Sequence, residues 1–120
     1  GDHVIPMFED KHDKIFSAVS HLPHVVSYAL VEMMNRRADS AELFDFAAGG
    51  FRDFSRIAGS SSEMWVDICR ANNEHIVKDV ESFIASLETI RELLKSGNYG
   101  ALQRIFAAAA VARNNWVSKQ

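Results

Sequence analysis

The strongest structural signal in the chain lies in residues 12–34, which read HDKIFSAVSHLPHVVSYALVEMM. At 3.6 residues per turn, apolar side chains fall on nearly every face of this stretch, and the pattern predicts a buried helix. One sector of about 80° is polar instead, at roughly 100° per residue. This polar stripe consists of Asp13, Ser17, Ser20, His24 and Tyr28, with His21 at its edge. Buried polar groups cost free energy unless they are paired, so the stripe predicts either a wet cavity or a polar helix that faces it.

Pro23 lies in the middle of this predicted helix, between His21 and His24. Proline has no backbone N–H, so the carbonyl of Val19 would lose its usual hydrogen-bond donor. We therefore expect a kink in the helix at this point. The freed carbonyl and the two imidazoles are expected to lie at one place.

The rest of the chain shows the spacing of further helices, and it lacks the alternating runs that are typical of β-strands. The predicted helices cover residues 10–37, 41–48, 74–95 and 99–117, and residues 51–58 are expected to form a compact amphipathic turn or helix. A further helix is expected to begin with a capping box at Ser60–Glu63, and Asn72-Asn73 is expected to mark a turn or kink after it. We predict an all-α bundle of about five or six helices. Residues 1–9 are expected to be a leading segment in which Pro6 starts the structure and Phe8 anchors it.

Glycine and asparagine mark several of the predicted helix ends. Gly49-Gly50 is expected to break the chain between two helices, because glycine permits a positive φ and a close backbone approach. Gly97 stands where a left-handed residue commonly ends a helix. Asn98 is expected to cap the last helix through its side chain.

Residues 74–95 carry a heptad pattern. The apolar positions recur at alternating spacings of four and three, at Ile76, Val80, Phe83, Leu87, Ile90 and Leu94. Such a seam is typical of packing between helices, within a chain or across two chains. Its length leaves room for a second copy of this chain, and a symmetric homodimer is the commonest assembly of that kind.

Length, charge and cysteine usage limit the class of protein. A chain of 120 residues is expected to form one domain, residues 1–120, with a core of its own. The net charge is −3, from 13 basic and 16 acidic residues, and no basic patch stands out, which argues against nucleic acid and anionic membranes as partners. No apolar run is long enough to span a membrane. Cys69 is the single cysteine and has no internal disulfide partner, which favours a cytoplasmic protein.

Two long motifs resemble those of one known family. SHLPH at residues 20–24, preceded by HD at 12–13, and GGFRDFSRIA at 49–58 are similar to the signatures of the prephenate dehydrogenases. Ser55 replaces a threonine of the family motif, and EMW at 63–65 matches as well. The resemblance covers almost the whole chain, but only the C-terminal half of such an enzyme. It implies an all-α substrate-binding and dimerisation domain in an intertwined homodimer.

The resemblance also implies a reaction, the oxidative decarboxylation of prephenate to 4-hydroxyphenylpyruvate in tyrosine biosynthesis. NAD or NADP would be bound by an N-terminal Rossmann domain that this chain does not contain. Gly49-Gly50 is not a dinucleotide loop, because no strand precedes it and the G-x-G-x-x-G spacing is missing. The catalytic histidine of the family lies in the other half too, so no catalytic residue is assigned here and the isolated chain is expected to be inactive. Whether the substrate is prephenate or arogenate stays open.

The resemblance assigns seven residues to the substrate pocket: Asp13, His21, His24, Gly49, Asp53, Arg56 and Trp65. Arg56 would bind a substrate carboxylate, for which the planar guanidinium with its fork of donors is suited. His21 and His24 would line the pocket.

The remaining four residues would shape the pocket or complete it. Asp13 would orient its neighbours or pair within the pocket, and Asp53 and Gly49 would form part of its wall. Trp65 would reach the pocket of the other protomer. In some members of the family tyrosine inhibits by occupying the same pocket, which makes it a possible ligand here.

Two other classes of function remain open on the residues alone. The set His12, Asp13, His21 and His24 is similar to the ligands of all-α metal-dependent hydrolases of the HD type. That family needs a further histidine and a further aspartate in separate motifs, which this sequence lacks, so no metal site is predicted. The second class is a non-catalytic helical dimerisation module, in which the polar stripe only fixes the register of the helices.

Overall fold

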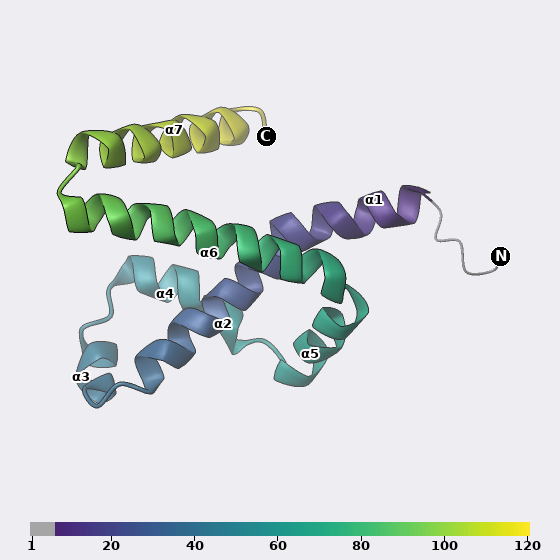
Figure 1. Ribbon diagram of the computed structural model, residues 1–120. Coiled ribbons are helices and arrows are strands. Elements are labelled where there is room, and N and C mark those ends of the chain that lie inside the picture. The colour runs from purple at the N-terminus through teal and green to yellow at the C-terminus, as the bar shows by residue number, and fades with distance from the viewer. Residues whose placement is uncertain (1–6) are drawn as a thin grey trace. The chain divides into compact units, whose positions relative to one another are not determined.

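The computed structural model describes residues 7–120 and the side chains of residues 9–120, so Pro6 and the Phe8 side chain of the expected leading segment lie outside the described residues. Every regular element of the described chain is helical (Figure 1). The elements are α1 (Met7–Phe16), η1 (Ser17–His21), α2 (Leu22–Asn35), α3 (Ser40–Asp45), α4 (Gly49–Ser55), η2 (Arg56–Gly59), α5 (Ser62–Ala71), α6 (Asn73–Ser96) and α7 (Tyr99–Ser118). The elements α1, η1 and α2 follow one another without a break, and so do α4 and η2. The nine elements of the described chain therefore form six continuous helical segments. The predicted all-α class and number of helices are confirmed.

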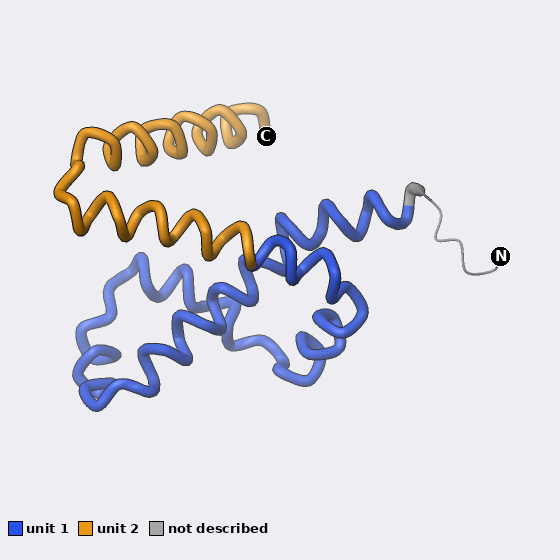
Figure 2. The backbone as a smooth tube through the Cα atoms, in the orientation of Figure 1, with its two compact units in different colours: residues 1–80 blue, residues 81–120 orange. Residues whose placement is uncertain are grey.

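The chain divides into two compact units (Figure 2). The first unit, residues 1–80, contains α1 to α5 and the beginning of α6. The second unit, residues 81–120, contains the remainder of α6 and all of α7, which runs back antiparallel to it (Figure 1). All seven residues that the sequence assigned to a substrate pocket belong to the first unit.

A π-helical turn interrupts the long N-terminal helix just before Pro23. At the end of η1 the backbone N–H of Leu22 donates to the carbonyl of Ser17, five residues back. Pro23 then lies in the first turn of α2, where a missing N–H is well tolerated. The sequence predicted a kink at this proline. In the structure the helix is irregular just before Pro23, where η1 inserts one extra residue as a π turn. Such turns inside α-helices are frequent at functional sites.

Ser17 and Ser27 are fully buried on this long helix. The hydroxyl of Ser17 donates to Oδ2 of Asp79 on α6 at 2.6 Å. The hydroxyl of Ser27 donates to the backbone carbonyl of Phe54 on α4 at 2.9 Å. Both hydroxyls are therefore paired, as buried polar groups need to be. Ser17 belongs to the polar stripe, so this part of the stripe faces a polar group of another helix, which is one of the two alternatives that the sequence left open.

Tyr28 makes a further attachment of this kind. Its hydroxyl donates to the backbone carbonyl of Ser60 at 2.9 Å. Phe54 precedes η2 and Ser60 follows it, so the bonds from Ser27 and Tyr28 fix both ends of η2 to α2. Arg56 is the first residue of η2, and α2 therefore holds the segment that carries this arginine.

The glycines differ in part from their predicted roles. Gly49 and Gly50 do not form a break with positive φ, because both lie in the first turn of α4 and the space around each is open. That expectation was wrong, since a helix start needs neither a left-handed residue nor a close approach. Gly97 has a φ of 70° and ends α6, which confirms its predicted position.

The side-chain caps follow the prediction closely. The predicted cap of α5 was Ser60, but Ser61 is the N-cap, and its hydroxyl accepts from the N–H of Met64 at 3.3 Å. The prediction was wrong by one residue because adjacent serines offer the same chemistry. Asn98 caps α7 as predicted, with its side-chain oxygen accepting from the N–H of Ala101 at 3.2 Å.

Few apolar side chains are buried within the chain. Among residues 9–120 the buried ones are Trp65, Ile76 and Leu102. The predicted seam on α6 is only partly covered, since Leu87 and Leu94 are half-exposed. Contiguous exposed apolar surface commonly marks an interaction site. No helix among the described residues is long and apolar enough to cross a membrane.

Candidate functional site

Two histidines and a tryptophan meet beside the π-helical turn. His21 ends η1, His24 lies in the first turn of α2, and Trp65 comes from α5. The imidazole of His24 stacks on the indole of Trp65, with ring centroids 3.7 Å apart and an interplanar angle of 16°. The imidazole of His21 approaches the same indole edge-on, at 5.9 Å and 75°. We call these three residues the His–Trp cluster.

The ring of His24 is also held from its own helix. Its Nδ1 lies 2.8 Å from the backbone carbonyl oxygen of Ser20, so Nδ1 carries the hydrogen of this bond. The sequence predicted that the carbonyl of Val19 would lie close to both histidines. The carbonyl that the structure pairs with His24 is that of the next residue, Ser20.

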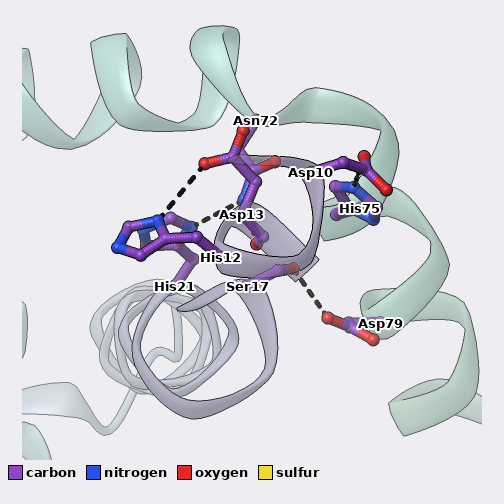
Figure 3. A network of polar contacts seen from close by, with 8 residues as sticks. All are labelled: Asp10, His12, Asp13, Ser17, His21, Asn72, His75 and Asp79. Atoms are coloured by element: carbon purple, nitrogen blue, oxygen red, sulfur yellow. Dashed lines mark hydrogen bonds and ion pairs between the residues drawn. The ribbon is translucent and has the colours of Figure 1, made fainter. Parts of the chain in front are cut away.

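Asn72 connects the cluster to α1. Its side-chain nitrogen Nδ2 lies 2.9 Å from the backbone carbonyl oxygen of Asp13 and 3.2 Å from Nδ1 of His21 (Figure 3). Asp13 therefore reaches His21 through its backbone and Asn72. Its carboxylate instead lies 3.6 Å from Nδ1 of the adjacent His12, and both of these side chains are about half-exposed.

The surroundings of His21 favour its uncharged form. Burial lowers the pKa of His21 below the usual value of 6.5, the Asp13 carboxylate opposes this shift, and His24 adds a smaller lowering. At neutral pH His21 is therefore a neutral imidazole, in which one ring nitrogen donates a hydrogen bond and the other accepts one.

Two further polar contacts attach the N-terminal helix to α6 (Figure 3). Nε2 of His75 lies 3.0 Å from Oδ1 of Asp10, and Ser17 donates to Asp79 as described. His75 and Asp79 are four residues apart on α6, so they lie one turn apart on one face. These contacts place α1, η1 and α6 around Asn72 and fix the setting of the cluster.

Arg56, Asp53 and Gly49 lie on the neighbouring segment α4–η2, and all three are exposed. The contacts among the described residues do not join these three to the His–Trp cluster. What relates the two groups is α2, which carries His24 and also holds both ends of η2. The structure thus brings together His21, His24, Trp65 and the backbone of Asp13, and it leaves the other three on the adjoining surface.

The hollows on the surface of the first unit do not coincide with the full predicted pocket. One of about 410 Å³ is lined by Val31, Phe44, Ala47, Phe51, Arg52, Ser55, Ala58 and Gly59. A smaller one of about 220 Å³ is lined by Val25, Tyr28, Ser62, Trp65, Val66 and Cys69. The larger hollow contains no member of the His–Trp cluster and no Arg56. The smaller hollow is lined by Trp65, which stacks on His24. It is therefore the better candidate for part of a substrate pocket.

The metal-dependent hydrolase finds no support in these residues. Within the described part of the chain, no three His, Cys, Asp or Glu side chains are placed so that they could hold a metal ion together. Nδ1 of His21 faces the amide of Asn72, and Nδ1 of His24 faces the carbonyl of Ser20. Each histidine is thus oriented by a hydrogen bond between its Nδ1 and a protein group, and no metal ion is needed to account for either orientation.

Comparison with known proteins gives the family. Residues 9–108 match the prephenate dehydrogenase dimerization domain. The chain belongs to this family. The prediction from the motifs is confirmed, and the match covers the His–Trp cluster, Arg56 and the first half of α7.

The curated relatives are longer than this chain. The prephenate dehydrogenase of Bacillus subtilis is 34% identical over 119 residues, which cover 98% of this chain and 32% of that protein. The cyclohexadienyl dehydrogenase of Zymomonas mobilis is 30% identical over 115 residues, which cover 94% of this chain and 39% of that protein. The chain therefore spans 32–39% of the length of these two relatives.

Solved structures of dehydrogenases contain the same fold. Prephenate dehydrogenase from A. aeolicus, in complex with hydroxyphenyl propionate and NAD+, is 37% identical with a TM-score of 0.80, over 88% of this chain and 37% of that chain. Synechocystis arogenate dehydrogenase has a TM-score of 0.85 over 90% of this chain and 40% of that chain. Its identity is 24%, so this second likeness shows the fold alone.

Trp65 packs within its own chain in this dimerization domain. The resemblance placed it in the pocket of the other protomer. In the structure 8% of the residue is exposed, and its ring stacks on His24 of its own chain. The described residues thus form a cluster that Trp65 completes from within, and a contribution to a partner's pocket stays a prediction.

Sequence reasoning missed Asn72, His75 and Asp79. The pair Asn72-Asn73 was interpreted only as a turn, which is correct for the backbone because α5 ends at Ala71 and α6 begins at Asn73. A buried side chain at a turn has no sequence signature of its own. The partners of Asn72 are 51 and 59 residues away, so only the folded chain reveals them.

Proposed function

We propose that this chain, residues 1–120, is the C-terminal substrate-binding and dimerisation domain of a dehydrogenase that converts prephenate to 4-hydroxyphenylpyruvate. The observation that carries the proposal is the His–Trp cluster beside the π-helical turn. It combines an aromatic ring with two imidazoles in a domain of the prephenate dehydrogenase family. An indole suits a flat six-membered ring, and imidazole N–H groups suit its hydroxyl or carboxylate oxygens.

The relatives support this choice of substrate class. Their names specify prephenate and cyclohexadienyl dehydrogenases, and the A. aeolicus enzyme was crystallised with hydroxyphenyl propionate and NAD+. Hydroxyphenyl propionate has a ring hydroxyl and a carboxylate, as does the expected product. Prephenate carries two carboxylates, so a site for it needs a cation as well as neutral donors.

Arg56 supplies that cation in our proposal. Its exposed guanidinium is available to a ligand, and α2 fixes both ends of the segment that carries it. His21 and His24 line the pocket as hydrogen-bonding groups, while Gly49 and Asp53 form part of the wall beside Arg56. Tyrosine, with its phenol and its carboxylate, is the expected competitor for the same groups.

In the proposed enzyme, the nicotinamide cofactor is bound by a part of the protein outside this chain. The described chain has no strand–turn–helix unit that could hold a dinucleotide. NAD or NADP is the hydride acceptor of the proposed reaction, and residues outside this chain would bind it. The residues of this chain bind and orient the substrate.

A homodimer is the second part of the proposal. Large apolar side chains of the second unit are exposed in the single chain: Ile84, Leu87, Leu94, Tyr99, Ile105, Phe106, Val111, Trp116 and Val117. They belong to a domain whose family is named for dimerisation. Burial of such surface is worth roughly 25 cal/mol per Å² of apolar area, so a second copy is the expected cover.

The test uses the full-length protein that contains this chain. Incubation with prephenate and NAD or NADP should yield 4-hydroxyphenylpyruvate and reduced cofactor, and arogenate in a parallel reaction tests the alternative substrate. Product formation that tyrosine inhibits competitively would support a shared pocket. Absence of turnover with both substrates and both cofactors, in a protein with intact helical circular dichroism, would contradict the proposed reaction.

A further inference from the structure

Asn72 occupies a place in the site that no sequence motif assigned to it. It stands between α5 and α6, and 8% of the residue is exposed. Its Nδ2 lies 2.9 Å from the backbone carbonyl oxygen of Asp13 and 3.2 Å from Nδ1 of His21 (Figure 3). One buried amide therefore contacts both α1 and a histidine of the His–Trp cluster.

The carbonyl of Asp13 fixes the direction in which this amide faces. A carbonyl oxygen only accepts hydrogen bonds, so the group near it must be the NH2 of Asn72 and not its side-chain oxygen. This NH2 has two hydrogens, and the second is available to Nδ1 of His21. Nδ1 must then accept and has no proton of its own. Because a neutral imidazole carries its proton on one nitrogen, Nε2 is the N–H donor of His21.

The backbone at this position does not require an asparagine. The N–H of Asn72 donates to the carbonyl of Ile68 at 3.0 Å, and its carbonyl accepts from the N–H of Ile76 at 3.1 Å. Any residue other than proline could make both bonds. The φ of Asn72 is −121°, which is open to L-residues other than proline. The side chain therefore has a role apart from the helix junction, and alanine can replace it without backbone strain.

We propose that Asn72 is a positioning residue that holds His21 as the Nε2–H tautomer, so that His21 presents a hydrogen-bond donor to an oxygen of the substrate. The proposal rests on the proposed function, in which His21 lines the substrate pocket. Without the amide, neither nitrogen of His21 would be specified as the donor. Burial acts in the same direction, because it keeps His21 uncharged at neutral pH.

Three groups facing His21 bear on its protonation. The Asp13 carboxylate favours the imidazolium, whereas His24 disfavours it. The NH2 of Asn72 also disfavours it, because a protonated Nδ1 would direct an N–H at another N–H. Removal of this amide should therefore raise the pKa of His21 and release the choice of tautomer.

The first measurement reads the tautomer directly. Protein labelled with 15N-histidine is examined by long-range proton–nitrogen correlation at pH 7.5, and a His21→Gln variant assigns the signals. Wild-type His21 should show an unprotonated Nδ1 and a protonated Nε2. Asn72→Ala should convert it to a mixture of tautomers, while the control Asn73→Ala, which truncates the exposed neighbour, should leave it unchanged. A protonated Nδ1 in the wild type would overturn the proposal, even if Asn72→Ala failed to fold.

The second measurement is kinetic and uses the full-length dehydrogenase. Asn72→Ala should raise KM for the substrate by about twofold, because a mixture of tautomers leaves roughly half of the molecules with the Nε2–H donor. Asn73→Ala should leave KM unchanged. An unchanged KM in Asn72→Ala would overturn the proposal if His21→Gln raises KM. If His21→Gln also has no effect, the proposed place of His21 in the pocket fails, and the positioning role fails with it, whatever tautomer the spectra show.

Discussion

Arg56 tests the substrate site at the scale of a single residue. A charge-assisted contact of its guanidinium with a carboxylate is worth about 2–4 kcal/mol, or roughly 30- to 1,000-fold in affinity. Arg56→Ala in the full-length enzyme should raise KM for prephenate by a factor in this range. A contact made equally in the ground and transition states would leave kcat nearly unchanged. Folding should be unaffected, because the side chain is exposed.

Arg70→Ala is the matched control for this arginine. Arg70 is also exposed, lies on α5 and pairs with Asp67 one turn away. Surface pairs of this kind contribute little to stability. The control should therefore have wild-type kinetics. Equal kinetics in Arg56→Ala and Arg70→Ala would remove Arg56 from the substrate site.

His24 distinguishes a ligand pocket from a device that only fixes helix register. Its contacts are one hydrogen bond to the carbonyl of Ser20 and the stack on Trp65. Leucine keeps the apolar contact, so His24→Leu should lower the free energy of unfolding by at most about 1.5 kcal/mol. The same change should impair prephenate turnover and the response to tyrosine in the full-length enzyme. A marked drop in melting temperature together with normal kinetics would support the register device instead.

The lowered pKa of His21 predicts how stability depends on pH. The unfolded chain takes up this proton near pH 6.5, whereas the folded chain resists it until a lower pH, because burial disfavours the imidazolium. The contribution of His21 to stability is therefore fully present above pH 6.5 and is lost as the pH falls from there through the folded pKa. Urea unfolding at pH 7.5 and at pH 5.0 should show a larger loss of stability for the wild type than for His21→Gln. Equal losses in both proteins would show that His21 titrates normally in the fold.

The segment η2 depends on α2 for its position, which makes Tyr28 the test at the scale of an element. Tyr28→Phe removes the donor to the Ser60 carbonyl and should cost about 1 kcal/mol of stability. Because Arg56 begins η2, KM for prephenate should rise as well. Thr89→Val is the control, since it removes an exposed hydroxyl that donates to the carbonyl of Ala85 in its own helix, and it should change neither quantity. A loss of stability in Tyr28→Phe with an unchanged KM would separate the anchoring of η2 from substrate binding.

The elements were largely predictable, because the signals that define a helix are local. The heptad on α6, the left-handed Gly97 and the cap at Asn98 each depend on residues within a few positions of one another. Gly49 was misread because a glycine marks a helix start and a turn in the same way. The π turn before Pro23 needed the fold, since proline alone predicts only that the regular ladder is disturbed.

The candidate site was predictable only as far as the motifs reach. The two motifs identified His21, His24 and Arg56 as candidate site residues, and the structure groups the two histidines with Trp65. No local pattern could give the amide of Asn72 as the partner of Asp13 and His21, because these contacts join residues more than 50 positions apart.

At the scale of the whole molecule, the chain has too small a core to account for its apolar content. Hydrophobic residues make up 48% of the sequence, yet the buried apolar side chains among residues 9–120 are Trp65, Ile76 and Leu102. Obligate homodimers commonly resemble a domain core divided between two chains, with interfaces above roughly 2,000 Å². The half-exposed Leu87 and Leu94 stand seven residues apart on α6, so they share one face that a second copy would cover.

This face gives the last prediction. Leu87→Glu places a charge where a partner is expected, and burying an unpaired charge costs several kcal/mol, so the variant should sediment as a monomer at micromolar concentration where the wild type is a dimer. Thr89→Glu adds the same charge two residues away, on the opposite side of α6, and should remain dimeric. Circular dichroism should show intact helices in both, because position 87 is already half-exposed in the single chain. A dimer that survives Leu87→Glu but not Thr89→Glu would place the interface on the other face of α6, and a monomeric wild type with intact helices would remove the dimer altogether.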